Sequence, residues 1–322
     1  MMEEYSRLLE AEIKKQKYGL QPVSLYEPIR YLMGLGGKRL RPMFCLLAYS
    51  LYKNDISKVV PYAVAVVAFH NFTLMHDDIM DKAPLRRGHR TVHVKWDVNT
   101  AILSGDVMLV KVYDMLLAME DRYVREVLRA FNKCASQVCE GQQWDMEFES
   151  KKDVTEKQYL NMIKLKTAVL LGFSLELGGL LAGASSEDCK SLREFGINIG
   201  LGFQLKDDLL DAYADSKKFG KQVGGDIIAN KKTFLLIKSL ELANRRQKHE
   251  LQRWISLKKF KKSEKVNAVK KIYDTLHIPD LTDAKINRFF KKGFDSLNGI
   301  NCSQESRARL VSYTQQLKGR ES

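Results

Sequence analysis

No proline occurs between Pro84 and Pro279. Proline breaks helix interiors, and β-sandwiches need frequent turns, so a stretch that long without proline favours helices. Apolar residues also recur every three or four positions, as in 107–117, and this spacing is typical of amphipathic helices. Strand-like alternation is scarce. The sequence therefore predicts an all-α fold, in which about a dozen helices form a single-domain bundle around a central cavity over residues 1–322.

Two segments are apolar on nearly every side, Pro61–Met75 and Ala168–Ala184. Helices of this kind belong in a protein core or in a membrane. The second segment is shorter than the ~20 residues that a spanning helix needs, and it contains Glu176. We therefore expect both segments to be buried core helices of a protein that is not integral to a membrane.

Cysteines and charge bear on the compartment and the partners. The chain begins with charged residues, which are unlike a signal peptide, and none of its five cysteines has CxxC spacing. Reduced thiols in the cytoplasm are the expectation. The net charge is +14, and much of the excess lies after residue 241. It is open to three interpretations: a solvated helix face, a field that steers anionic substrates, or contact with nucleic acid or a membrane surface.

Two aspartate clusters carry the strongest chemical signal. Asp77-Asp78-Ile79-Met80-Asp81 and Asp207-Asp208-Leu209-Leu210-Asp211 each follow an apolar segment. On a helix, the first and last aspartates of each cluster lie on one face, one turn apart. Like charges so placed repel each other, and apolar neighbours add a desolvation cost, so the pattern indicates a bound cation.

The ligand chemistry narrows the choice of cation. Carboxylate oxygens suit Mg²⁺, Mn²⁺ or Ca²⁺ rather than zinc or copper. Mg²⁺ takes only one or two carboxylates and completes its shell with water and substrate phosphate. The sequence lacks a twelve-residue calcium loop, so two such clusters favour Mg²⁺ ions that bridge a diphosphate between two helices.

Basic residues alternate with the aspartate clusters along the chain. Arginine makes forked contacts to phosphate oxygens, and lysine supplies a compact charge. A Gly-Gly pair at 36–37 also lets the backbone bend closely around an anion. The candidate phosphate ligands are Lys38, Arg39, Arg41, Arg86, Arg87, Lys166, Lys221 and Lys231.

These motifs, in this order, resemble the trans-isoprenyl diphosphate synthases, also called polyprenyl synthetases. The resemblance covers about Gly36–Lys231, with helical flanks on both sides. The matching stretches are GGKRLRP, HDDIMDKAPLRRG, GQQWD, KT, FQLKDDLLD and GKQVGGDIIANK. It implies the isoprenoid synthase type of helical bundle, a homodimer, and Mg²⁺ as cofactor, with three ions present when substrate is bound.

The resemblance also implies a role for each matching position. Metal binding falls to Asp77, Asp78 and Asp81 in the first motif and to Asp207, Asp208 and Asp211 in the second. The allylic diphosphate would meet Arg86, Lys166 and Lys221, and isopentenyl diphosphate would meet Lys38, Arg41, His70 and Arg87. Thr167, Gln204 and Lys231 would line the reacting centre, supported by Gln142 and Asp145.

The implied reaction joins isopentenyl diphosphate to dimethylallyl, geranyl or farnesyl diphosphate. Phe72 lies five residues before Asp77, about 7.5 Å along a helix at ~1.5 Å per residue, and would block a growing chain, while Thr73 is small. By resemblance, one aromatic residue at these two positions indicates geranylgeranyl diphosphate (C20) as the main product, with farnesyl diphosphate (C15) as the alternative.

Three other functions compete with this interpretation. Terpene cyclases and head-to-head synthases also use helical aspartate motifs, but cyclases typically replace the second DDxxD. A non-catalytic subunit of a heteromeric prenyl synthase usually lacks one motif, and both are intact here. A basic helical nucleic-acid binder has no supporting zinc-finger or aromatic motif in the sequence.

Overall fold

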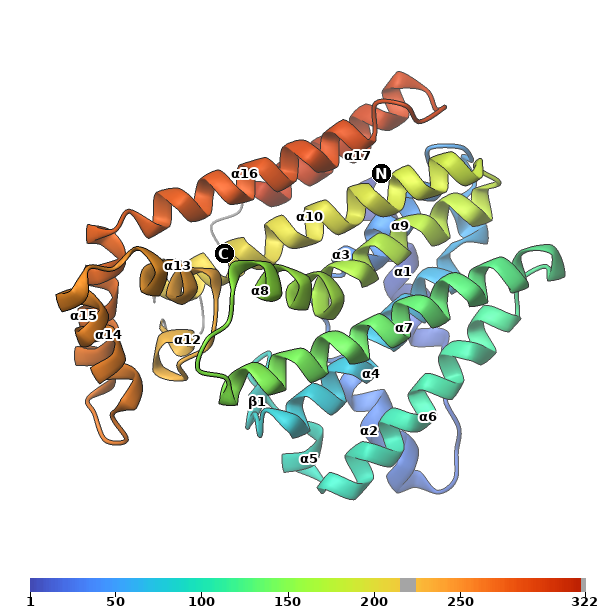
Figure 1. The fold of residues 1–322 in the computed structure, drawn as a ribbon. Helices are drawn as coiled ribbons and strands as arrows, with labels where there is room; N and C mark the ends of the chain where they lie inside the picture. Colours follow the sequence, from blue (N-terminus) through green and yellow to red (C-terminus); the bar gives the residue numbers. More distant parts are fainter. Residues whose placement is uncertain (215–223, 320–322) are drawn as a thin grey trace. The chain divides into compact units, whose positions relative to one another are not determined.

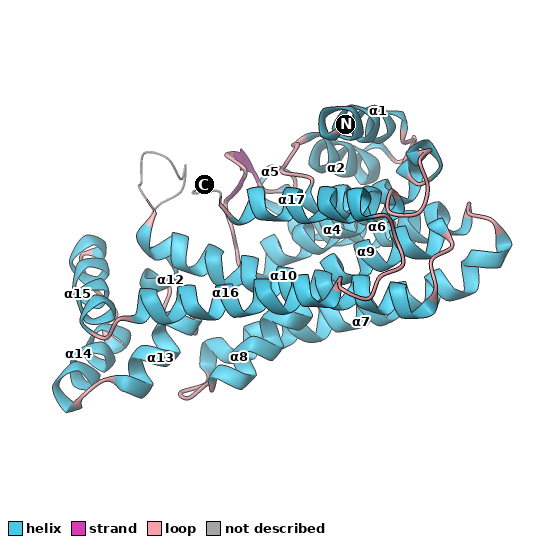
Figure 2. Cartoon of the chain, turned by 90° about the horizontal axis from the view of Figure 1, so that it is seen from above, coloured by secondary structure: helices cyan, strands magenta, loops and turns pink. Residues whose placement is uncertain are grey.

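The computed structural model describes residues 1–214 and 224–319, and most of these residues are helical (Figure 1). Within that described part, the strands are β1 (Leu85–Arg86) and β2 (His89–Arg90), which pair as a short antiparallel hairpin (Figure 2). The prediction of an all-α fold is confirmed.

The described residues form two compact units. The first unit takes residues 1–133, 173–193 and 300–310, and the second takes the other described residues. Several helices contribute residues to both units: α7 (Asp121–Ser150), α9 (Val169–Ala182), α10 (Ser186–Tyr213) and α17 (Gln304–Lys318).

The first unit is built around α4 (Val60–Met80), which is apolar on nearly every side. Pro61 lies in its first turn, where the missing N–H costs no hydrogen bond. All residues of 63–69 are buried, as the sequence predicts for this segment. Besides the β1–β2 hairpin, the other elements that lie wholly within this unit are α1 (Met2–Lys15), α2 (Val23–Gly34), α3 (Leu40–Tyr49), the 3₁₀ turn η1 (Ile56–Lys58), α5 (Val92–Lys95) and α6 (Val98–Leu117).

The second unit holds a series of shorter helices. Two of them begin with a capping box, in which the side chains of the cap and of the third helical residue satisfy orphan backbone N–H groups. Thr155 and Gln158 form the box of α8, and Asn244 and Gln247 form that of α14. The elements are α8 (Glu156–Ile163), the π-helix η2 (Lys164–Ala168), α12 (Gly225–Ile228), α13 (Phe234–Leu242), α14 (Arg245–Ser256), α15 (Lys262–Thr275) and α16 (Ile278–Ser296).

The predicted apolar helix 168–184 corresponds to α9. It ends at Gly183, whose φ of +77° is readily adopted by glycine. The N–H of Ala184 donates to the carbonyl of Gly179, which closes a Schellman motif. The segment Glu156–Ala182 is long and apolar enough to cross a membrane, but 78% of its most apolar window is buried inside the protein. That burial is typical of a core helix.

Candidate active site

The first aspartate motif occupies the last turn of α4, in the first unit. The N–H of Asp81 donates to the carbonyl of Asp77 at 2.8 Å and caps the helix. Asp78 is only 2% exposed, whereas Asp81 is exposed and Asp77 is part-exposed. The outer aspartates of the motif can therefore reach a ligand in solvent, and the middle one belongs to the protein interior.

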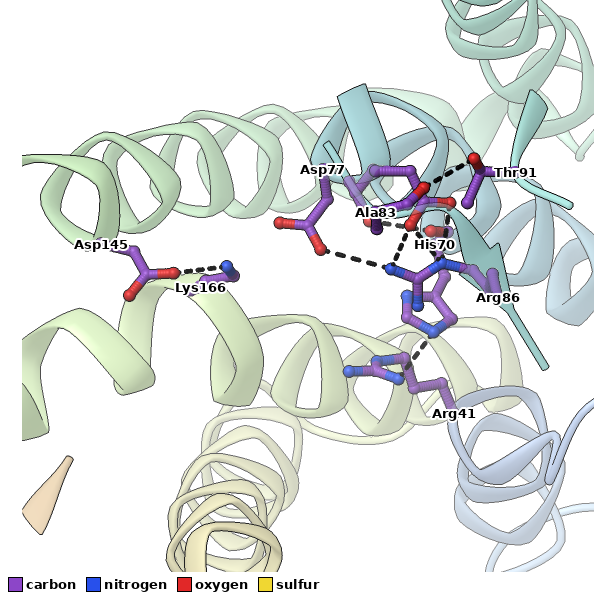
Figure 3. A network of polar contacts seen from close by, with 10 residues as sticks. Arg41, His70, Asp77, Ala83, Arg86, Thr91, Asp145 and Lys166 are labelled. Carbon is purple, nitrogen blue, oxygen red and sulfur yellow. Dashed lines mark hydrogen bonds and ion pairs between the residues drawn. The ribbon is translucent and has the colours of Figure 1, made fainter. Parts of the chain in front are cut away.

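Arg86 binds the buried carboxylate from the β1–β2 hairpin. Its Nε lies 2.8 and 2.9 Å from the two oxygens of Asp78. Its Nη2 lies 3.5 Å from a carboxylate oxygen of Asp77 (Figure 3). The turn of the hairpin is formed by Arg87 and Gly88, with φ values of +53° and +77°. Two positive φ angles are what a two-residue type I′ hairpin requires. This turn fixes the strand that carries Arg86.

Charge and burial act in opposite directions on the middle aspartate. Burial raises the pKa of the Asp78 carboxyl, and the Asp77 charge adds to that rise. The hydrogen bonds and positive charge of Arg86 lower the pKa again. A cation at close range favours the ionised carboxylate. Arg86 thus compensates the burial of Asp78 and also lies at the edge of the motif, beside Asp77.

The Gly-Gly turn of the GGKRLRP motif lies against the second arginine of the hairpin. Arg87 donates through Nη1 to the carbonyl of Gly36. Gly37 has a φ of +140°, and a Cβ built there would lie 2.9 Å from the guanidinium carbon of Arg87. Only glycine permits this close approach without displacement. The structure therefore joins two motifs that lie about 50 residues apart, while Lys38 is exposed to solvent.

A histidine lies among these arginines. Nη1 of Arg41 is 3.1 Å from Nε2 of His70 (Figure 3). A guanidinium only donates, so Nε2 accepts and the imidazole is neutral. Burial, with the charges of Arg41, Arg87, Arg86 and Arg39, holds the pKa of His70 well below its usual value. Two of the four guanidinium groups around the neutral imidazole are ion-paired, Arg86 with Asp78 and Arg39 with Glu10. The cluster can contribute positive charge to a site for a diphosphate.

The predicted chain-length residues lie on α4, one to two turns before the first motif. Phe72 is 9% exposed, and its ring packs against Phe69 and His76 at centroid distances of 5.7 and 4.8 Å. Thr73 donates through its hydroxyl to the carbonyl of His70. Phe72 is thus held by aromatic neighbours on its own helix, as a rigid stop in a cavity would have to be.

The second aspartate motif lies near the end of α10, in the second unit. Asp208 is 7% exposed and accepts hydrogen bonds from the hydroxyl of Tyr159 and, at 3.0 Å, from the amide of Gln204. The Gln204 carbonyl in turn accepts from the hydroxyl of Thr167 at 3.1 Å. Burial, together with the nearby Asp226, raises the pKa of Asp208 to about 7, although both hydrogen bonds oppose the rise.

The outer aspartates of this motif differ from each other. Asp207 is exposed, and Asp211 organises the loop that follows. The N–H of Asp226 donates to the Asp211 carboxylate at 2.9 Å, and the N–H of Gly224 donates to the Asp211 carbonyl at 2.6 Å. The N–H of Lys231 then donates to the Asp226 carbonyl. The second motif and the loop 224–231 therefore form one hydrogen-bonded structure.

The predicted Lys-Thr pair lies in the π-helix η2. Gly141 of α7 and Gly200 of α10 let the two helices approach it closely: a Cβ at Gly141 would overlap the backbone nitrogen of Lys166, and one at Gly200 would come within 2.8 Å of Ala168. Lys166 forms an ion pair of 2.7 Å with Asp145 of α7 (Figure 3). Single-turn π-helices are frequent at functional sites.

Two residues of this site were not identified from the sequence. Tyr159 lies outside all the quoted motifs, and nothing in its local pattern signals a partner 49 residues away. Asp226 stands inside the motif GKQVGGDIIANK but was assigned no role. Among the predicted residues, Gln142 is part-buried on α7 and Lys231 is exposed. Lys221 lies outside the residues that the structure describes.

The acidic side chains fit Mg²⁺ better than a metal that needs a protein cage. In the part of the chain that the structure describes, no group of three or more His, Cys, Asp or Glu residues is placed to hold a metal ion. Mg²⁺ does not require such a group, because water and substrate phosphates supply most of its ligands. Asp77, Asp81 and Asp207 offer carboxylate oxygens that the solvent can reach.

Comparisons with known proteins identify the family. The model of the polyprenyl synthetase family matches residues 22–276, so the chain belongs to the polyprenyl synthetases. It is similar to a geranylgeranyl diphosphate synthase of Methanosarcina mazei, with 44% identity over 69% of each chain. A geranylgeranyl diphosphate synthase of Sulfolobus acidocaldarius is 36% identical over 90% of this chain and 88% of its own.

Solved structures agree with the sequence matches. A crystal structure of a geranylgeranyl pyrophosphate synthase shares 40% identity and a TM-score of 0.95, covering 100% of this chain and 99% of its own. The geranylgeranyl pyrophosphate synthetase of Pyrococcus horikoshii shares 33% identity and a TM-score of 0.91, covering 99% and 97%. The isoprenoid synthase type of fold expected from the motifs is therefore confirmed.

Proposed function

We propose that the protein is a Mg²⁺-dependent trans-prenyltransferase that condenses isopentenyl diphosphate with dimethylallyl, geranyl or farnesyl diphosphate. One observation supports this most strongly. In each of two DDxxD motifs the middle aspartate is anchored by the protein, by Arg86 in one and by Tyr159 in the other, while carboxylates beside it stay open to solvent. Such motifs can hold a metal-bound diphosphate without losing their shape.

The reaction proceeds by ionisation, addition and proton loss. The allylic C–O bond breaks, and the diphosphate leaves with the electron pair. The double bond of isopentenyl diphosphate then attacks the allylic cation to form the new C–C bond, and a proton leaves the adduct to the departed diphosphate. Bound Mg²⁺ would supply neutralisation of the charge that develops on the leaving group.

The residues of the chain are assigned to metal binding, to the two diphosphates and to the reacting centre. Asp77, Asp78, Asp81, Asp207, Asp208 and Asp211 are the proposed metal-binding set, with three Mg²⁺ ions when substrate is bound. Arg86, Lys166 and Lys221 are assigned to the allylic diphosphate, and Lys38, Arg41, His70 and Arg87 to isopentenyl diphosphate. Thr167, Gln204 and Lys231 would line the reacting centre, supported by Gln142 and Asp145.

Two features of the described site fit these roles. The neutral imidazole of His70 keeps a hydrogen-bond partner for Arg41 without adding a further buried charge. The hydroxyl of Thr167 and the amide of Gln204, linked at 3.1 Å, present polar atoms but no strong base. A carbocation needs stabilising dipoles and exclusion of water, and a nearby nucleophile would quench it.

We propose geranylgeranyl diphosphate as the main product. The relatives named geranylgeranyl diphosphate synthase support C20, and so does a single bulky residue, Phe72, followed by the small Thr73. Farnesyl diphosphate is the alternative product. A non-catalytic subunit of a heteromeric synthase is the alternative of another class, and two intact aspartate motifs argue against it.

We also infer that the two units act as one polyprenyl synthetase domain over 1–322, and that the protein works in the cytoplasm as a homodimer. Helix α6 supports the dimer. Leu103, Val110 and Leu117 recur every seven residues and are exposed, so they form one apolar stripe along the helix. In sedimentation analysis, we expect the wild-type protein to have the mass of a dimer and Val110→Glu to have the mass of a monomer. A Val110→Glu variant that stays a dimer would contradict this interface.

One assay tests the enzyme assignment. The purified chain is incubated with dimethylallyl and isopentenyl diphosphates, with Mg²⁺ or with EDTA, and the dephosphorylated products are separated by chromatography. We expect metal-dependent elongation that stops near C20. Asp77→Asn and Asp207→Asn should each slow turnover by at least about a hundredfold, whereas Asp114→Asn, an exposed aspartate of α6, should not. Cyclic products, or no turnover with every metal tried, would contradict the proposal.

Product length has its own test. If Phe72 is the stop, Phe72→Ala opens the cavity and the products become longer than those of the wild type. Phe69→Leu is the matched control, because Phe69 contacts Phe72 on the same helix and its ring is almost completely buried. Products of unchanged length from Phe72→Ala would show that another residue ends chain growth.

A further inference from the structure

A buried lysine lies behind the loop that follows the second aspartate motif. Lys265 of α15 is only 1% exposed. Its ammonium donates to the carbonyl of Ile228 at 3.1 Å and to the side-chain oxygen of Asn230 at 2.6 Å, and it lies 4.4 Å from the centre of the Phe260 ring. None of these partners is a carboxylate. Burial of a cation is costly unless its hydrogen bonds are satisfied, so these contacts hold the ammonium in one place.

Asn230 transmits that restraint to the loop. Its φ is +57°, a left-handed conformation that asparagine tolerates better than most residues. Its amide nitrogen donates to the carbonyl of Ile255 at 3.1 Å, while its oxygen accepts from Lys265. One side chain therefore ties the loop to both α14 and α15, immediately before Lys231.

The opposite side of the same loop is tied to the aspartate motif. Asp226 is held by the Asp211 carboxylate, and the Lys231 N–H donates to the Asp226 carbonyl. Lys265, Asn230, Lys231, Asp226 and Asp208 line one small pocket of the second unit. The loop thus runs between two anchors, the motif on one side and the buried lysine on the other.

We propose that Lys265 is a positioning residue for the condensation reaction. It fixes the loop so that Asp226 and Lys231 keep their places beside the second aspartate motif. The proposal rests on the proposed function, which assigns Lys231 to the reacting centre. Lys265 itself acts through Ile228 and Asn230 and touches neither substrate nor metal.

The first test compares two lysine variants of the second unit. Lys265→Met removes the ammonium and keeps the aliphatic volume. Lys285→Met is the control, because Lys285 is a part-buried lysine that pairs with Glu156 of α8, which is not part of the loop 224–231. Both variants are assayed below their unfolding temperatures.

The expected change is in kcat rather than in KM. Displacement of a reacting group by about 1 Å lowers the rate about a hundredfold. We therefore expect kcat of Lys265→Met to fall by about ten- to a hundredfold, with KM for both diphosphates changing less than threefold. Lys285→Met should keep kcat within about twofold.

The second test asks whether the effect passes through Asn230. Asn230→Gly keeps the left-handed backbone and removes the amide. It should lower kcat by itself, and the double variant with Lys265→Met should be no slower than Lys265→Met alone, because both changes break one connection. Lys265→Arg should restore part of kcat. The Asn230→Gly result also decides the matter if Lys265→Met does not fold.

Several results would overturn the inference. The first is a Lys265→Met variant that loses stability but keeps kcat. The second is an equal loss of kcat in Lys285→Met. The third is a double variant whose loss of kcat is the product of the losses in Lys265→Met and Asn230→Gly. In each of these cases the wild-type protein still elongates its substrates, and the enzyme assignment stands. If the wild-type protein does not elongate, the proposed function falls, and this inference falls with it.

Discussion

The two DDxxD motifs have the same sequence pattern, but the partners of the middle aspartate differ in charge. In the first unit, Asp78 is buried against a cation, Arg86, which contacts both of its oxygens. In the second unit, Asp208 is buried against neutral donors, Tyr159 and Gln204, with another carboxylate, Asp226, nearby. Hence the pKa of Asp208 rises to about 7, while Arg86 restrains the rise at Asp78.

This difference indicates that the two motifs respond differently to a ligand. The first motif carries its own counter-charge, Arg86, which favours the ionised form of the buried Asp78 carboxylate in the absence of metal. The second collects negative charge, and among the residues that the structure describes, the hydrogen-bond partners of Asp208 are the neutral Tyr159 and Gln204, so a bound metal ion relieves more repulsion there. The charge of the first motif should therefore change little when metal binds or pH changes. The charge of the second motif should depend on both.

The largest expected effect comes from breaking the cation pair of the first motif. Arg86→Met leaves Asp78 buried without its partner, and breaking a buried pair costs about 3–5 kcal/mol of unfolding free energy. We expect this loss at pH 8 in urea unfolding, together with a fall in turnover of at least about a hundredfold, the usual effect of losing one charge-stabilising donor. Arg90→Met, an exposed arginine on the facing strand, is the control. Equal stability of the two variants would show that Asp78 does not depend on Arg86.

Asp208→Asn should raise the free energy of unfolding of the metal-free protein, whereas Arg86→Met lowers it. The folded pKa of about 7 exceeds the usual 3.8, so the folded state binds the proton more tightly. Stability is then highest below the unfolded pKa and declines as pH rises through about 4 to 7. Each pKa unit is worth about 1.4 kcal/mol, so asparagine should stabilise the protein by about 2–4 kcal/mol at pH 8.

The pH dependence provides the check on that prediction. The gain should be much smaller at pH 5, where Asp208 is already protonated in the folded state. Asp78→Asn should stabilise the protein much less than Asp208→Asn at pH 8, because Arg86 offsets part of the burial that raises the pKa of Asp78 and loses its carboxylate partner in the variant. Thermal unfolding in EDTA measures both variants. If Asp78→Asn raises the melting temperature at pH 8 as much as Asp208→Asn does, the electrostatic contrast between the motifs is wrong.

The fold and the outer residues of the motifs were predictable from local patterns. The stretch free of proline and the i, i+3, i+4 spacing predict helices, and both depend only on residues close in sequence. The positions of Asp77 and Asp81, one turn apart, follow from helix geometry alone. The motifs shared with the polyprenyl synthetases then extended the prediction to residues whose local pattern is weak, such as His70 and Gln204.

The partners of the middle aspartates were not predictable in the same way. Tyr159 reaches Asp208 from another helix, and the π-helix at 164–168 depends on close approach of two helices at Gly141 and Gly200. These features arise from tertiary packing, which selects hydrogen-bond partners without leaving a periodic signal. Asp226 was visible beside two glycines, but only its bond to Asp211 reveals its place.

The smallest effect, Tyr159→Phe, tests whether a neutral donor is what supports Asp208. Loss of a hydrogen bond to a charged group costs about 1.5–3 kcal/mol, and loss of one to a neutral group about 0.5–1.5 kcal/mol. Because Asp208 ionises near pH 7, the variant should lose more stability at pH 8 than at pH 5. The control is Tyr213→Phe. In the same unit, the hydroxyl of Tyr213 donates a hydrogen bond to the carboxylate of Asp274, which is exposed to solvent. Water can replace that bond, so its loss should be smaller and similar at both pH values. A pH-independent loss in Tyr159→Phe would mean that Asp208 does not change its charge in this range, and the contrast between the two motifs would then be one of shape alone.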